Sequence, residues 1–220
     1  MTAPAADLSR VVALVPIRGI ETAKARLGEV LDAEERRALA GRLLRRTLRA
    51  AASAPGVALA ALVSPDHEAL DLATAHGAVA LEESGAGLNA ALDEGRAWAR
   101  SIGATALLVL PADLPAIDAR AVADIVARAR AAVAGAGETD ARPLVALVPD
   151  RDGSGTNALL LSPPGAIPFA FGPGSRAAHA AAAGRAGARY LELGGPLSLD
   201  LDLPDDLLLA GDPGRPGDDA

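Results

Sequence analysis

The sequence of 220 residues predicts an α/β fold with three layers, in which helices cover both faces of a mostly parallel central sheet. Short aliphatic runs alternate with longer stretches whose apolar residues recur at helical spacing. Hydrophobic residues make up 50% of the chain and aromatic residues only 2%, so alanine, leucine and valine must build the core. Because no linker or internal repeat is visible, we expect one domain over residues 1–210, followed by a disordered tail at 211–220.

The first half of the chain contains four runs that are typical of buried strands, at 11–16, 57–63, 78–81 and 105–110. Helical patterns begin near Asp32, Asp66, Leu88 and Asp118. Asp32 and Glu35 have the spacing of a capping box, which predicts the start of the first long helix.

The second half continues the alternation after a Gly- and Ala-rich segment at 134–142, which predicts a surface loop. We expect one helix at 176–184 and four strands, at 144–148, 158–161, 190–193 and 197–201. Sheets of this kind bind ligands beyond the carboxyl ends of their strands, so the loops that follow the strands are expected to carry function.

Composition excludes several classes of function. The chain has no cysteine, which rules out disulfides, thiolate zinc sites and cysteine nucleophiles. A net charge of -7 without a basic stretch argues against a nucleic-acid partner. The N-terminus lacks the pattern of a signal peptide, and no apolar run approaches the ~20 residues that span a bilayer. We therefore expect a cytoplasmic protein with no membrane partner; its oligomeric state is left open.

The loop after the first strand gathers three cations, Arg18, Lys24 and Arg26, around Gly19. Lys24 is the only lysine among 21 Lys and Arg residues, so this position is predicted to need a compact ammonium, which can act as a point charge on a phosphate. The alternative is an ordinary solvated loop. Neither a Walker A motif nor G-x-G-x-x-G follows this strand.

Three aspartates are candidate ligands of magnesium. Asp113 lies between two prolines directly after the strand at 105–110. Asp200 and Asp202 alternate with leucines, so in an extended segment they share one face and repel unless a cation lies between them. The alternatives are that Asp113 caps the next turn and that Asp200 and Asp202 form an acidic strand end before a helix cap.

Two glycine-rich turns, GSGTN at 153–157 and FGPGSR at 171–176, could present backbone N–H groups to an oxyanion. The second turn opens a helix, for which Ser175 could simply be the N-cap. Arg176 and His179 lie on the first turn of this helix and could face a ligand or solvent. As the base of a nucleophile, His179 has no obvious Ser or Cys partner, and we assign no role to His67 or His76.

Five segments, LVPIRGIETAKARL, VLPADLP, GSGTNALLL, FGPGS and LSLDLDLPDDL, resemble in their order the phosphoenolpyruvate or 2-phospho-L-lactate guanylyltransferases of coenzyme F420 biosynthesis. The similarity covers about positions 11–207. It implies the nucleotidyltransferase fold, which is nucleotide-diphospho-sugar transferase-like and Rossmann-like and is shared with molybdenum cofactor guanylyltransferases. The implied reaction joins GTP to a phosphorylated three-carbon acid and releases pyrophosphate. In actinobacterial members the acid is phosphoenolpyruvate and the product is enolpyruvoyl-2-diphospho-5'-guanosine.

The resemblance also implies roles for individual residues. It implies phosphoenolpyruvate contacts for Thr156, Gly172 and Ser175, magnesium ligands at Asp113, Asp200 and Asp202, and triphosphate contacts for Lys24, Arg18 and Arg26. Independently of the resemblance, we expect the loop at 85–89, with Asn89, to contribute to the guanosine pocket and Gly19 to contact the nucleotide. The first loop departs from the family pattern at two positions, because Arg18 replaces a lysine and Ala25 replaces a serine.

Other functions remain compatible with the sequence. The same reaction could use 2-phospho-L-lactate, 3-phosphoglycerate or a sugar phosphate, and a partner enzyme of the same pathway is a further expectation. A non-catalytic nucleotide-binding domain is the alternative from another class. The missing glycine fingerprint disfavours an NAD-dependent oxidoreductase.

Overall fold

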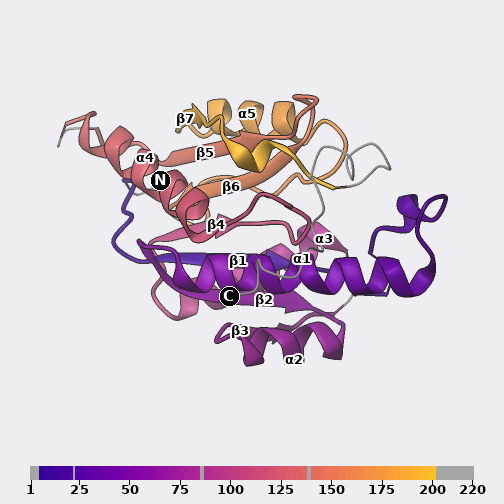
Figure 1. Ribbon diagram of the computed structural model, residues 1–220. Helices are drawn as coiled ribbons and strands as arrows, with labels where there is room; N and C mark the ends of the chain where they lie inside the picture. The colour runs from indigo at the N-terminus through magenta and orange to yellow at the C-terminus, as the bar shows by residue number, and fades with distance from the viewer. Residues whose placement is uncertain (1–4, 22, 85–86, 138–139, 202–220) are drawn as a thin grey trace.

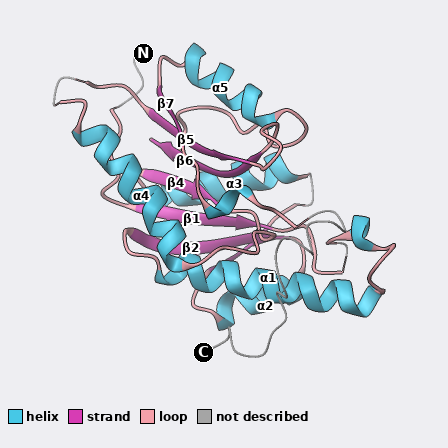
Figure 2. Ribbon diagram, turned by 45° about the horizontal axis from the view of Figure 1, so that its top comes forward, coloured by secondary structure: helices cyan, strands magenta, loops and turns pink. Residues whose placement is uncertain are grey.

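The computed structural model, which describes residues 5–21, 23–84, 87–137 and 140–201, is built on one seven-stranded sheet of order β3-β2-β1-β4-β6-β5-β7. The strands are β1 (Val11–Pro16), β2 (Val57–Ser64), β3 (Val79–Glu82), β4 (Ala106–Val109), β5 (Leu144–Pro149), β6 (Thr156–Ser162) and β7 (Arg189–Glu192). Only β6 runs antiparallel to its neighbours, β4 and β5. The succession from β7 to β2 is visible in Figure 2. The predicted mostly parallel sheet is therefore confirmed.

Helices cover both faces of this sheet and complete the three predicted layers. The helices are α1 (Ala33–Ser53), α2 (His67–Ala75), α3 (Leu88–Ser101), α4 (Ala119–Ala134) and α5 (Ser175–Arg185), with short 3₁₀ helices η1 (Ala25–Leu27) and η2 (Pro196–Ser198). Buried side chains of α1, α2 and α4 form one apolar cluster with the sheet, and those of α3 and α5 form another. Figure 1 shows α1 and α4 in front of the strands and α3 behind them.

Aspartates begin three of the helices, as the sequence predicts. The Asp32 carboxylate accepts a hydrogen bond from the Glu35 backbone N–H, and the Glu35 carboxylate accepts one from the Asp32 N–H, both at 2.8 Å. Such a cap is worth about 1 kcal/mol of helix stability. Asp66 and Asp118 cap α2 and α4 through single side-chain acceptors. The capping box predicted for Asp32 and Glu35 is confirmed, and α2 and α4 begin where their helical patterns were expected to begin.

The strand predicted at 197–201 is wrong. The segment begins with η2, and Leu199 to Leu201 pair with no strand in the described sheet. Pro196 at the start of η2 lacks an N–H for a ladder, and the Asn157 side chain donates to the carbonyls of Leu197 and Ser198 at 3.1 and 3.0 Å. A side chain therefore takes the acceptors that a neighbouring strand would have used.

Close packing of α3 on the sheet depends on Gly95. A Cβ at this position would lie 2.6 Å from a methyl group of Leu14 in β1. Leu88, in the first turn of α3, and Pro16, at the carboxyl end of β1, line the same cavity. Within the described ranges, no helix is long and apolar enough to cross a membrane. The predicted tail at 211–220 lies outside the described residues, and the single domain at 1–210 stays a prediction.

Candidate active site

The candidate site lies at the carboxyl ends of β1 and β4, which are adjacent parallel strands. The loop after β1 carries Lys24, and the loop after β4 carries Asp113. The Lys24 ammonium donates to a carboxylate oxygen of Asp113 at 3.0 Å. The Lys24 side chain is 5% exposed and that of Asp113 is 30% exposed, so solvent reaches this ion pair from the carboxylate side. The topology therefore brings together two residues that the sequence singled out separately.

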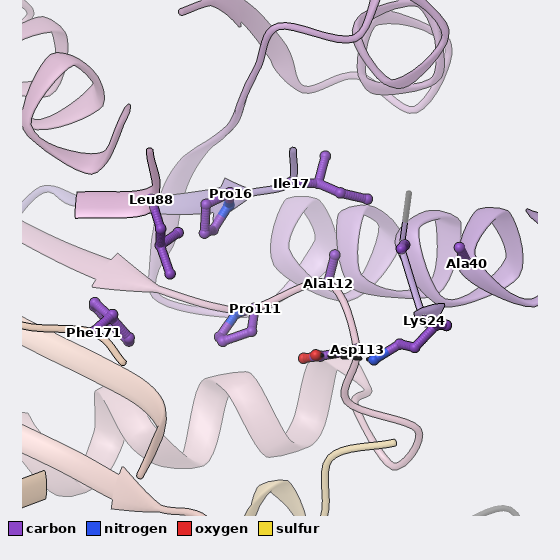
Figure 3. A pocket seen from close by; sticks show the side chains of 10 residues that line it. Pro16, Ile17, Lys24, Ala40, Leu88, Pro111, Ala112, Asp113 and Phe171 are labelled. Atoms are coloured by element: carbon purple, nitrogen blue, oxygen red, sulfur yellow. Dashed lines mark hydrogen bonds and ion pairs between the residues drawn. The ribbon is translucent and has the colours of Figure 1, made fainter. Parts of the chain in front are cut away.

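These two residues line a cavity of about 240 Å³. They are the only ionisable side chains among the described residues of its wall, which is otherwise apolar. Figure 3 shows Lys24 reaching toward Asp113, with Leu88 and Phe171 on the other side of the cavity. The wall thus offers one cation, one carboxylate and flat apolar surface, and it contains no histidine that could act as a general base.

Lys24 occupies an unfavourable backbone conformation. Its φ of 62° and ψ of 27° are left-handed, and it is the one non-glycine residue of the described chain with a positive φ. For a residue with a Cβ this conformation costs about 1–2 kcal/mol. Lys24 precedes η1, and its carbonyl accepts from Leu27, whose side chain is fully buried. Packing of η1 therefore holds the lysine in a geometry that its own preference opposes.

The last of the described residues approach Asp113 through their backbone. The Leu201 N–H donates to the Asp113 carbonyl at 3.1 Å, and the buried Leu201 side chain packs with Leu27, Leu39 and Leu43. Asp200, partly buried, is one residue from this contact. Asp202 lies outside the described residues. The part of the chain that the structure describes contains no cluster of three His, Cys, Asp or Glu that could hold a metal. Two of the three predicted magnesium ligands therefore belong to segments in contact.

The other residues of the first loop lie elsewhere. Arg18 and Gly19 line a neighbouring cavity of about 420 Å³ together with acidic residues, among them Asp66. The Asp66 carboxylate accepts from the Ile20 N–H at 2.8 Å and so fixes the path of this loop. Arg26 lies in η1, and its side chain is outside the described part. The structure does not bring Arg18 into the cavity with Lys24.

The predicted acceptor-binding residues gather near the first turn of α5. Because β6 is antiparallel, its first residue, Thr156, lies at the same edge of the sheet as the ends of β1 and β4. Ser175 is the first residue of α5, is 2% exposed and donates through its N–H to the Gly172 carbonyl at 3.1 Å. The N-cap is Gly174, in the left-handed conformation, so the alternative reading of Ser175 as the N-cap is wrong.

A β-bulge aims the side chain of Thr156. In the pairing of β5 with β6, Val148 lies opposite Ala158 but Pro149 lies opposite Thr156, so Asn157 is an extra residue. Side chains alternate along a strand, and one extra residue moves those before it to the other face. Thr156 therefore faces α5, whereas the amide of Asn157 reaches η2. Neither direction follows from the alternation in the sequence.

Asn89, predicted to bind the nucleotide, bridges α3 to the loop before α5. Its amide nitrogen donates to the Phe171 carbonyl at 3.0 Å, and its amide oxygen accepts from the Phe171 N–H at 2.9 Å. Phe171 lines the 240 Å³ cavity. In this structure Asn89 therefore holds a wall of the cavity through the backbone, and a nucleotide contact of its side chain stays a prediction.

His179, for which the sequence left open whether it faces a ligand or solvent, lies in the interior beside Thr156. It is fully buried, and burial lowers its pKa to about 4. Its Nδ1 lies 3.1 Å from the Thr156 hydroxyl oxygen, and its Nε2 accepts a hydrogen bond from the Ala170 N–H at 3.0 Å. Its ring packs edge-on against the Phe171 ring, with the ring centroids 5.1 Å apart. Since these partners come from other elements, no local spacing in the sequence could have identified them.

Two solved structures share the fold of this chain. A nucleotidyl transferase from Methanothermobacter matches with a TM-score of 0.59 at 15% identity, covering 90% of this chain and 94% of that chain. A 4-diphosphocytidyl-2C-methyl-D-erythritol synthase matches with a TM-score of 0.59 at 19% identity, covering 92% of this chain and 97% of that chain. The fold is that of the nucleotidyltransferases, as expected.

Within this class, the chain belongs to the family described as guanylyl transferase CofC like, whose model matches residues 11–210. A phosphoenolpyruvate guanylyltransferase of Rubrobacter xylanophilus is 47% identical over 198 residues, which cover 90% of this chain and 91% of the relative. Another relative of that name, from Sphaerobacter thermophilus, is 43% identical over 198 residues, covering 89% and 90% of the two chains. The family resemblance predicted from the motifs is confirmed.

Proposed function

We propose that this chain is a Mg²⁺-dependent guanylyltransferase that joins GTP to phosphoenolpyruvate in coenzyme F420 biosynthesis. The products are enolpyruvoyl-2-diphospho-5'-guanosine and pyrophosphate. The observation that carries the proposal is the Lys24–Asp113 pair in the cavity beyond β1 and β4, in a chain with relatives named for this activity. Both substrates are metabolites of the cytoplasm, which is where we place the reaction.

The chemistry explains why the cavity wall needs no general base. A phosphate oxygen of phosphoenolpyruvate is already anionic and attacks the α-phosphorus of GTP. The bond from the α-phosphorus to the bridging oxygen breaks, and pyrophosphate leaves with that electron pair. The protein has to bring two anions together in line and to stabilise the charge that grows on the leaving group. Lys24 and Asp113, the ionisable residues of the described wall, suit this task.

The donor set fits magnesium. Asp113 and Asp200 belong to segments joined by the Leu201–Asp113 backbone hydrogen bond, and carboxylate oxygens are the ligands that Mg²⁺ prefers. Asp113 and Asp200, with Asp202, would hold the ion. Bound there, the ion would reduce the repulsion between the two substrates. A few protein ligands suffice, because Mg²⁺ usually shares its coordination with substrate phosphates and water.

The side chains of the site have two further tasks, to stabilise the leaving pyrophosphate and to bind the acceptor. Lys24 donates to oxygens of the departing pyrophosphate, where a buried ammonium is worth most. Thr156 and Ser175 hold the acceptor beside the first turn of α5, since the positive end of a helix dipole favours an anion. Phe171, held in place by Asn89, supplies apolar surface between these residues.

The test is a pyrophosphate-release assay that crosses GTP, ATP, CTP and UTP with phosphoenolpyruvate, 2-phospho-L-lactate and 3-phosphoglycerate, with Mg²⁺ or with EDTA. We expect turnover only with GTP, an acceptor and Mg²⁺, and the highest kcat/KM with phosphoenolpyruvate. Higher kcat/KM with another acceptor would change the substrate but keep the chemistry. Turnover without an acceptor, or preference for another nucleotide, would contradict the guanylyltransferase assignment. No turnover in any combination would favour a non-catalytic nucleotide-binding domain.

A further inference from the structure

We propose that His179 is a positioning residue that fixes the Thr156 hydroxyl as a hydrogen-bond donor to the anionic acceptor substrate. The inference rests on the proposed function for the identity of that substrate. It is carried by the hydrogen bonds of the His179 ring and by the bulge that turns Thr156 toward it. His179 itself does not reach the reacting atoms; it acts through Thr156.

The hydrogen bonds determine which ring nitrogen carries the proton. A backbone N–H can only donate, so the Ala170 N–H requires an unprotonated Nε2 on His179. A neutral imidazole has one N–H, which must then be on Nδ1. Nδ1 lies 3.1 Å from the Thr156 hydroxyl oxygen and donates to it. The backbone of Ala170 thus selects the tautomer, and the tautomer selects the role of the threonine.

The hydrogen bond from His179 also sets the direction of the Thr156 O–H group. A hydroxyl has one hydrogen to donate, and its oxygen here accepts from His179, so the hydrogen points away from the ring. Thr156 is 7% exposed at the start of β6, on the edge of the sheet where the Lys24–Asp113 pair lies. Phosphate and carboxylate oxygens accept hydrogen bonds, so a threonine that is fixed as a donor favours an anion at this edge.

The surroundings hold the ring in this state. His179 is fully buried, the Phe171 ring packs against it, and no charged side chain contributes to lowering its pKa, which results from burial. A protonated ring would present an N–H to the Ala170 N–H, and two donors would face each other. The neutral Nδ1–H form is therefore the one that this packing accepts across the physiological pH range.

Two substitutions separate the two contacts of the ring. In His179→Gln the terminal amide lies near the position of Nε2, which keeps an acceptor for Ala170 but removes the donor to Thr156. In His179→Asn the amide lies near Nδ1, which keeps the donor and loses the acceptor. We expect His179→Gln to raise the KM for phosphoenolpyruvate about tenfold, the effect of losing one hydrogen bond to a charged group, with the KM for GTP unchanged. The rise in His179→Asn is smaller. His76→Gln, at the end of α2, is the control.

A double-mutant cycle tests whether His179 acts through Thr156. Thr156→Val removes the hydroxyl, and we expect it to raise the KM for phosphoenolpyruvate by a similar factor, whereas Thr156→Ser restores the hydroxyl and most of the affinity. The combined variant His179→Gln/Thr156→Val is then no worse than Thr156→Val alone, because residues that act in one chain of contacts are not additive. Multiplied effects, or equal rises in the KM values for phosphoenolpyruvate and GTP, would overturn the role of His179.

The tautomer can be measured in the wild-type protein, which avoids any dependence on the folding of a variant. The chain has three histidines, and long-range ¹H–¹⁵N NMR spectra show which ring nitrogen of each carries a proton. We expect one histidine to remain neutral at pH 5.5 with its proton on Nδ1. A proton on Nε2 would overturn the inference. Failure of the wild-type protein to release pyrophosphate would instead overturn the proposed function and leave this measurement valid.

Discussion

The side of the candidate site beyond β1 and β4 carries opposite charges within reach of solvent, whereas the side at the start of β6 carries neutral polar groups that are buried. On the first side, Lys24 and Asp113 form an ion pair whose carboxylate is 30% exposed. On the second side, Thr156 and His179 are 7% and 0% exposed and are joined by one hydrogen bond.

The difference shows how the two sides can serve different steps. Solvent reaches the Asp113 carboxylate, so Asp113 can turn from Lys24 to an arriving metal ion, which leaves the buried ammonium of Lys24 for the phosphates. A buried network of neutral hydrogen bonds resists rearrangement, because each unpaired group costs about 1–3 kcal/mol. We infer that the charged side adapts to the nucleotide and that the neutral side is fixed before the acceptor binds.

Loss of the carboxylate on the charged side is expected to have the largest effect. Asp113→Asn keeps the shape of the side chain and the backbone acceptor for Leu201, but it removes the negative charge. We expect kcat to fall on the order of 10³-fold and the melting temperature to change by only a few degrees. Steady-state pyrophosphate release and thermal melting measure both. Asp124→Asn, at an exposed position of α4, is the matched control, and an Asp113→Asn variant within tenfold of wild type would contradict the assignment.

Exchange of the cation on the same side comes second. In Lys24→Arg the charge remains, but a planar guanidinium replaces a compact ammonium in a side-chain position that is only 5% exposed. We expect kcat/KM to fall about 10²-fold, with a rise in the KM for GTP. The same assay measures this. Full activity of Lys24→Arg would show that position 24 requires only a positive charge.

The charged side was predictable from the sequence because it depends on one topological rule. Lys24 and Asp113 each follow a predicted strand, and parallel strands end at the same edge of a sheet, so both residues were expected at this edge. That their strands are neighbours is known only from the strand order of the structure. The capping box of Asp32 and Glu35 was predictable for a similar reason, since a cap bonds within three residues.

The neutral side depends on contacts that no local rule reveals. The bulge at Asn157 reverses the alternation that would assign a face to Thr156, and His179 meets its partners from a separate helix. The wrong prediction of a strand at 197–201 also comes from a contact between distant residues. The side chain of Asn157 donates hydrogen bonds to two backbone carbonyls of this segment. Arg18 was grouped with Lys24 by sequence proximity, yet the Ile20–Asp66 hydrogen bond directs the loop so that Arg18 lines another cavity.

The third largest effect is expected on the neutral side, where the contribution of His179 to stability depends on pH. His179 has a pKa of about 4 in the folded chain, below the ordinary value of 6.5, so the unfolded chain binds more protons between these pH values. Its contribution to stability is therefore present above pH 6.5 and is lost as the pH falls toward 4. We expect the free energy of unfolding to drop by roughly 2 kcal/mol more in wild type than in His179→Gln between pH 7 and 4.5. Urea denaturation at both pH values measures this, and equal losses in the two proteins would contradict it.

The smallest effect concerns the backbone of Lys24. Lys24→Gly and Lys24→Ala both remove the ammonium and the ion pair with Asp113, so we expect both to lose activity to the same extent. They differ in the left-handed conformation at φ 62°, which glycine adopts freely and alanine adopts at a cost of about 1–2 kcal/mol. The greater freedom of glycine in the unfolded chain offsets part of this difference, so Lys24→Gly should be more stable by roughly 0.5–1 kcal/mol.

Urea denaturation of the two variants measures that difference, and equal stability would show that packing of η1 does not impose the left-handed conformation. A more stable and inactive glycine variant would have a direct interpretation. The chain then keeps a lysine where its backbone prefers glycine, because the ammonium is needed beside Asp113. The unfavourable backbone conformation would thus be a feature of the charged side. On the neutral side, a β-bulge and buried hydrogen bonds position Thr156 and His179 instead.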